Sequence, residues 1–127
     1  MIELHYPSDC GNAPKKKFLI DLNKAFVEGD FSKIEMALDT NVEWIMDGNL
    51  AIKSKKKFLE KYKSMFKADT TKLQINNIIT HGKTAACHGI ITTKDGNQYL
   101  FADIYEFKSA GSKLISKLTS FITIVKQ

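Results

Sequence analysis

The 127-residue sequence contains no arginine, although its 19 basic residues outnumber its 14 acidic ones and give a formal net charge of +5. Arginine supplies the planar, bidentate donor with which proteins read phosphates and guanine edges. A surface that carries only lysine therefore does not favour specific nucleic-acid recognition. We expect most of the lysines to form a solvated face and expect no specific nucleic-acid partner.

Cysteines and long apolar runs are also scarce. The two cysteines, Cys10 and Cys87, lie far apart and show no CxxC spacing, so neither a disulfide framework nor a zinc site is indicated. No apolar run approaches the roughly 20 residues of a membrane helix. The first twelve residues carry Glu3 and Asp9 and lack the apolar centre of a signal peptide. We expect a cytoplasmic protein with no metal, no cofactor and no membrane partner.

The apolar content suits an ordinary folded domain. Hydrophobic residues make up 43% of the chain, including eight phenylalanines, four tyrosines and one tryptophan. The length matches a typical domain of about 100–150 residues. We therefore expect a single domain over residues 1–127, with residues 1–12 as an N-terminal extension.

The first half of the chain has the apolar spacing of three helices. Phe18 begins a run at helical spacing that stops at Gly29. Asp30 is placed to cap a short second helix, and Ser54 is placed to cap a third one. Residues 42–46 alternate between two faces, as a strand does.

The second half reads as four longer strands, over residues 73–80, 84–93, 98–108 and 113–126. Short glycine-containing segments separate these strands, which is typical of antiparallel hairpins. The chain is therefore predicted to be α+β, with three N-terminal helices packed on one curved antiparallel sheet.

This element order resembles the nuclear transport factor 2-like superfamily, which includes ketosteroid isomerases and SnoaL-type polyketide cyclases. The resemblance rests on the break at residues 28–30, the strand segment 39–44 and the penultimate strand at residues 101–107. It implies a cone in which the sheet wraps the helices around a pocket for a small, largely apolar molecule. It also implies a homodimer formed through the outer face of the sheet.

The resemblance implies roles for only some of the residues. Asp103 falls where ketosteroid isomerases carry an acid that holds an oxyanion. Their general base would align with Trp44 and their helix tyrosine with Leu19, so ketosteroid isomerase activity is not expected. Trp44 and Met46 would face the pocket, where Trp44 either stacks on a flat ligand or packs in the core.

The turn between the two central strands decides what faces Asp103. A two-residue turn at 95–96 places His88 directly opposite Asp103, on the same face. A turn one residue later pairs His88 with Tyr105 and keeps Asp103 on that face. A three-residue loop pairs His88 with Ile104 and separates it from Asp103. Two of the three registers therefore predict a His–Asp pair.

These patterns lead to two functional hypotheses. In the first, a SnoaL-like isomerase, dehydratase or cyclase uses His88 to move a proton and Asp103 to orient it or to hold an oxyanion. In the second, the pair is structural, and the protein is a ligand-binding or protein-interaction module without chemistry. The expected ligand contacts are Trp44, Met46, Tyr62, Phe101 and Tyr105, where Tyr62 either brings its hydroxyl to the pocket mouth or lies at the rim with its tip in water.

Overall fold

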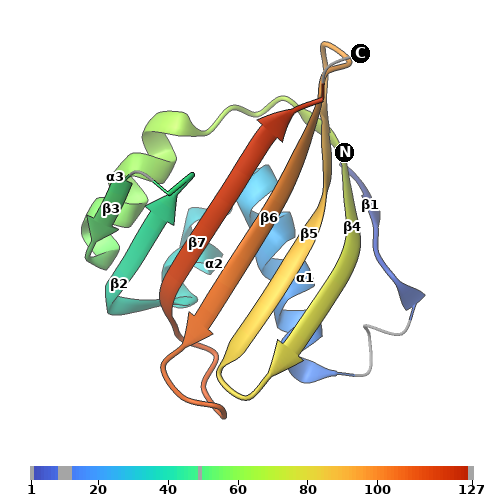
Figure 1. Ribbon diagram of the computed structural model, residues 1–127. Coiled ribbons are helices and arrows are strands. Elements are labelled where there is room, and N and C mark those ends of the chain that lie inside the picture. Colours follow the sequence, from blue (N-terminus) through green and yellow to red (C-terminus); the bar gives the residue numbers. More distant parts are fainter. Residues whose placement is uncertain (1, 9–12, 49, 126–127) are drawn as a thin grey trace.

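The computed structural model describes residues 2–8, 13–48 and 50–125 (Figure 1). A seven-stranded sheet has the order β1-β4-β5-β6-β7-β2-β3, and three helices pack on one of its faces. The helices are α1 (Pro14–Glu28), α2 (Phe31–Met36) and α3 (Lys55–Met65). The strands are β1 (Glu3–His5), β2 (Leu38–Met46), β3 (Leu50–Lys53), β4 (Thr70–His81), β5 (Thr84–Thr93), β6 (Gln98–Phe107) and β7 (Ile115–Ile124).

The helices begin and end where local chemistry dictates. The Asp30 side chain accepts a hydrogen bond from the first turn of α2, and Ser54 does the same for α3, which confirms both predicted caps. Helix α1 ends at Gly29, whose φ of +76° is costly for any residue with a Cβ. A Cβ at Gly29 would also lie 2.5 Å from the ring of Phe66.

The predicted α+β architecture is confirmed, but the sheet, which was predicted to be antiparallel, is mixed. Strands β4 to β7 form the expected antiparallel meander. Two parallel pairings extend it: β1 runs along β4, and β2 runs along β7. Two parallel strands need a long connection between them. For β2 and β7 the connection is the chain that contains β3, α3 and strands β4 to β6. The segment predicted as an N-terminal extension thus contributes β1, and β3 was not foreseen.

The core lies between the helices and the inner face of the sheet. Its largest fully buried side chains include Tyr105, Phe58 and Phe107. The Trp44 indole stacks on the Phe58 ring of α3, with centroids 4.2 Å apart. Burial of this aromatic surface fastens α3 to β2. In the described part of the chain no helix is long and apolar enough to cross a membrane.

The predicted pairing of His88 with Asp103 is wrong. His88 lies opposite Ala102, and Asp103 lies opposite Cys87. A connection over residues 94–97 produces this register, which differs from all three that were predicted. The physical cause is Asp95, whose carboxylate accepts hydrogen bonds from the Thr93 hydroxyl and from the backbone N–H of residue 97. Side-chain bonding of this kind stabilises a longer turn than the backbone preference alone predicts.

The observed register separates His88 and Asp103 onto opposite faces of the sheet. Directly paired residues share a face, and successive residues alternate. Asp103 is paired with Ser120 of β7 and faces the helices. His88 is exposed on the outer face beside Ala102. The structure therefore contains no His–Asp pair at these two positions.

Candidate functional site

A cavity of about 240 Å³ opens between α1, α3 and the inner face of the sheet. Most of its wall is apolar, with Trp44, Phe101 and Leu118 contributed by three different strands. The polar side chains along it include Asn23, Asp103 and Ser120. We call this space the Asp103 cavity. A largely apolar hollow with few convergent polar groups is the usual form of a small-molecule site.

Asp103 is the group in this cavity with the most perturbed acidity. Burial raises the pKa of its carboxyl from the ordinary 3.8 to about 6. Hydrogen bonds from the hydroxyls of Ser120 and Tyr105 lower the pKa and offset only part of that rise. The carboxyl is therefore mostly ionised at neutral pH but takes up a proton with little cost.

The hydroxyls of Ser120 and Tyr105, which hydrogen-bond to Asp103, each accept a hydrogen bond from an N–H donor of another side chain. The Trp44 indole N–H donates to Ser120 Oγ at 3.0 Å. The Asn23 amide donates to the Tyr105 hydroxyl at 3.1 Å. Because each hydroxyl oxygen already accepts a hydrogen bond, its own proton is free to point to the Asp103 carboxylate. Two donor relays therefore converge on one carboxyl group.

Tyr105 keeps its proton under all ordinary conditions. Complete burial raises the pKa of its phenol well above the usual 10, and the nearby charge of Asp103 raises it further. Tyr105 therefore acts as a permanent donor. Tyr105 was expected to contact a ligand, but its side chain is fully buried and is not among the residues that line the cavity.

Asn23 and Ser120 are residues of the candidate site that the sequence analysis did not identify. Asn23 is 6% exposed, and its amide also donates to the Leu19 carbonyl at 2.8 Å, which fixes its rotamer. Its signal in the sequence is an amide four residues after Leu19, within the apolar stripe of α1. Ser120 follows Leu118 at the two-residue spacing of an inward-facing strand position. A polar residue at a predicted core position is the pattern that identifies both.

The remaining predicted ligand contacts divide into two groups. Trp44, Met46 and Phe101 line the cavity, and their contact with a ligand stays a prediction. Tyr62 also lines it, but its hydroxyl donates to the Phe26 carbonyl and does not reach freely into the mouth. Burial raises the pKa of the Tyr62 phenol strongly, so this clamp between α3 and α1 stays intact at high pH.

The known proteins that resemble this chain do so in structure. No protein-family model and no curated protein matches the sequence. A nuclear transport factor 2-like protein of unknown function from Burkholderia xenovorans LB400 has a TM-score of 0.75 at 13% identity, covering 89% of this chain and 85% of that one. A proposed ketosteroid isomerase from Kribbella flavida has a TM-score of 0.72 at 14% identity, covering 89% and 80%.

A third structure widens the range of activities on this fold. A proposed SnoaL-like polyketide cyclase from Shewanella denitrificans has a TM-score of 0.71 at 6% identity, covering 88% of this chain and 92% of that one. The chain thus has the nuclear transport factor 2-like fold, with helices packed on a curved, unclosed mixed sheet. Identities this low establish the fold and assign no activity.

Proposed function

We propose that the protein binds a small, largely apolar molecule in the Asp103 cavity and that Asp103 moves a proton on it. The observation that carries this proposal is a carboxyl group with a pKa of about 6 in an apolar wall. General bases work best when their pKa lies near the working pH. The reaction class is an isomerisation, dehydration or ring closure that begins with removal of a proton from carbon.

The geometry suits a base that both takes and returns a proton. Asp103 accepts the proton from a carbon next to a carbonyl group, and the electron pair moves onto the carbonyl oxygen as an enolate. The same carboxylic acid then returns its proton at another position of the molecule. Donation from Ser120 and Tyr105 holds the carboxylate in one orientation throughout. The cavity of about 240 Å³ is smaller than the 300–1,000 Å³ of drug-sized sites, which favours a substrate of about one ring.

The alternative is a binding module that keeps the cavity without the chemistry. The resemblance described in the sequence analysis favours it, because it implies that Trp44 and Leu19 replace the base and the tyrosine of ketosteroid isomerases. Trp44 is also held by its stacking on Phe58 and its bond to Ser120, as a structural residue would be. The two functions differ in whether Asp103 is accessible as a base.

A carbon acid of suitable size tests this difference. In 5-nitrobenzisoxazole a base removes the ring C–H proton, the electron pair forms a nitrile and the N–O bond breaks to release a coloured phenolate. We expect the protein to accelerate this reaction with a rate that rises with pH around 6. The Asp103→Asn variant should lose about 100-fold or more, which is the usual contribution of a general base. The Glu60→Gln variant, changed at an exposed position of α3 that does not line the cavity, is the matched control.

Equal rates for the wild-type protein and Asp103→Asn would refute the catalytic proposal. Quenching of the Trp44 fluorescence by the same compound would then show that the cavity binds without catalysis, as the alternative requires. The absence of both signals would contradict each of the two functions for a ligand of this size.

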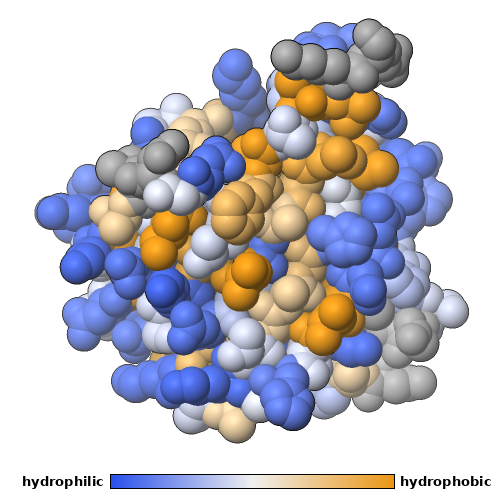
Figure 2. Space-filling model, in the orientation of Figure 1, coloured by the Kyte–Doolittle hydropathy of each residue, from blue (hydrophilic) through white to orange (hydrophobic). Residues whose placement is uncertain are grey.

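We further propose that two copies associate through the outer face of the sheet. Leu100 and Ile104 of β6, Ile79 of β4 and Phe121 of β7 are each more than 40% exposed on this face. Figure 2 shows apolar side chains spread across the middle of the sheet. Monomeric proteins seldom expose large continuous apolar patches. A second copy with the same patch would bury it, provided that the contact covers the roughly 1,200–2,000 Å² of a stable interface.

A further inference from the structure

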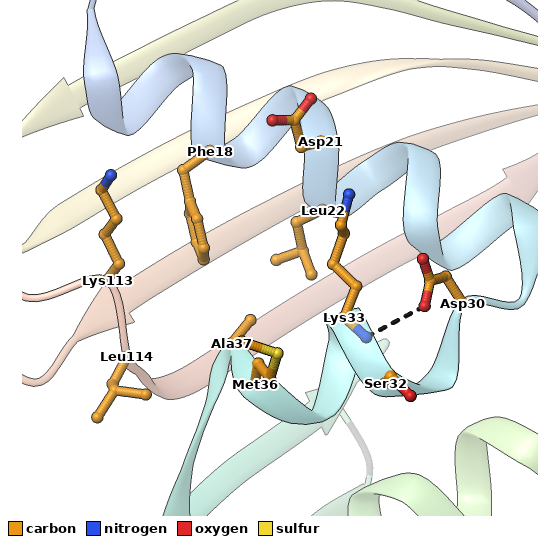
Figure 3. A pocket seen from close by; sticks show the side chains of 10 residues that line it. All are labelled: Phe18, Asp21, Leu22, Asp30, Ser32, Lys33, Met36, Ala37, Lys113 and Leu114. Carbon is orange, nitrogen blue, oxygen red and sulfur yellow. Dashed lines mark hydrogen bonds between the residues drawn. The ribbon is translucent and has the colours of Figure 1, made fainter.

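A second cavity, of about 520 Å³, lies between α1, α2 and the loop that joins β6 to β7. It shares no lining residue with the Asp103 cavity. We call it the α1–α2 cavity (Figure 3). Its volume falls within the 300–1,000 Å³ typical of small-molecule sites. Neither the proposed proton transfer nor the proposed dimer uses it.

The floor of the α1–α2 cavity is apolar. Phe18 and Leu22 project into it from α1, Ala37 closes it below, and Met36 and Leu114 stand at its margin. Met36 is 79% exposed at this margin. A flexible thioether at the margin adapts to apolar groups of different shape. The floor therefore fits the hydrocarbon part of a ligand.

Two lysines give this floor a charged margin. The Lys33 side chain rises from α2 and the Lys113 side chain rises from the loop, on the two sides of Phe18 and Leu22 (Figure 3). Over the described ranges 2–8, 13–48 and 50–125, neither ammonium group forms an ion pair. Both are therefore available to a ligand.

The two carboxylates near the cavity are already occupied by other donors. Asp21 forms an ion pair with Lys17 at 3.1 Å, and its carboxylate points away from Leu22 in Figure 3. Asp30 accepts the backbone N–H of Lys33 at 3.2 Å as the cap of α2. With Asp21 paired to Lys17, the two lysines Lys33 and Lys113 face the single remaining carboxylate of Asp30, so the net charge at the margin is positive.

We propose that the α1–α2 cavity binds a small amphipathic anion, with its hydrocarbon part on Phe18 and Leu22 and its anionic group near Lys33 and Lys113. A medium-chain carboxylate has this chemistry. Both lysines are exposed, so the charged contacts add modest affinity that decreases with salt. Apolar contact on the cavity floor supplies the rest.

Amide NMR shifts with three matched eight-carbon probes test the proposal: octanoate, octanol and octylammonium. Octanoate should shift the amides of Phe18, Leu22, Ala37 and Leu114 and leave that of Trp44 in the other cavity unchanged. It should bind more tightly than octanol, and octylammonium should bind most weakly. Raising the salt from about 0.05 M to about 0.5 M should reduce the preference for octanoate.

Variants separate the charged from the apolar contribution. Replacing Lys33 and Lys113 together with glutamine should weaken octanoate about three- to tenfold, as expected for two exposed ion pairs, and leave octanol unchanged. Met36→Ser should weaken both probes, and its high exposure makes loss of folding an insufficient explanation. Lys24→Gln, at an exposed position of α1 outside the cavity, is the control and should change nothing.

Several results would overturn the proposal. The first is that octylammonium binds as tightly as octanoate. The second is that the double lysine variant binds octanoate with unchanged affinity. The third is that octanoate at up to tens of millimolar shifts none of the amides of the floor residues. Shifts confined to Trp44 and Phe101 would assign the anion to the Asp103 cavity instead. The first three outcomes leave the role of Asp103 as a base untouched, because the two cavities share no lining residue.

Discussion

Replacing Asp103 by asparagine should stabilise the protein at neutral pH and remove part of its pH dependence. Asparagine has the same shape but carries no charge, so it removes the cost of holding a carboxylate in an apolar wall. The folded-state pKa of about 6 lies above the ordinary 3.8. Protonation of Asp103 therefore favours folding. Its full benefit is present below about pH 3.8 and is lost as the pH rises through about 6.

The size of the effect follows from that difference in pKa. At about 1.4 kcal/mol for each pKa unit, the ionised carboxylate costs the folded state roughly 3 kcal/mol above pH 7. The cavity is open to solvent and the side chain is partly exposed, so we regard this as the upper end and expect about 1–3 kcal/mol. Hydrogen bonds lost or rearranged at Ser120 and Tyr105 add a contribution that does not vary with pH.

Urea denaturation between pH 4.5 and 8, followed by the fluorescence of Trp44, measures this effect. The difference in unfolding free energy between Asp103→Asn and the wild-type protein should grow as the pH rises from 4.5 and should level off above about pH 6–7, where Asp103 is ionised in the folded state. Asp95→Asn is the control, because hydrogen bonds from Thr93 and the Asn97 backbone lower the pKa of Asp95. The stability that the ionised Asp95 carboxylate contributes to the fold is present above the pKa that this group has in the unfolded state, and it changes only at acidic pH. A difference for Asp103→Asn that is constant from pH 4.5 to 8 would refute the reasoning.

Two further predictions concern the scaffold. Gly29→Ala should destabilise the fold by about 1 kcal/mol more than Gly82→Ala. Both positions have a positive φ, but only a Cβ at Gly29 would meet the Phe66 ring, at 2.5 Å. Equal losses of stability in thermal or urea unfolding would contradict this. Replacing Leu100 and Ile104 by lysine should convert a dimer to a monomer in sedimentation velocity, whereas a wild-type protein that is already monomeric at micromolar concentration would contradict the proposed interface.

Local signals carried most of the element assignment. Asp30 and Ser54 cap helices as their side-chain chemistry predicts, and Gly29 ends α1 because the left-handed conformation there suits glycine. The strand predicted over residues 84–93 matches β5 at both ends. These features depend on residues within one or two turns of each other, so the sequence contains the information that is needed.

Register was not a local property. The preference of Asp95–Gly96 for a two-residue turn was overruled by the hydrogen bonds of the Asp95 side chain to Thr93 and Asn97. A shift of one residue moves every side chain of a strand to the other face. The predicted partnership of His88 with Asp103 failed for that reason alone. The parallel pairing of β2 with β7 is equally non-local, since the two strands lie about seventy residues apart.

The sequence by itself determined that a carboxyl group lies on an aromatic strand of an α+β fold whose order resembles nuclear transport factor 2. Only the tertiary structure decided what surrounds that group. Helix α1 brings Asn23 to Tyr105, and strand β2 brings Trp44 to Ser120, so that two hydroxyls converge on Asp103. Acidity depends on burial and on donors that arrive from distant segments, and neither quantity exists before the chain has folded.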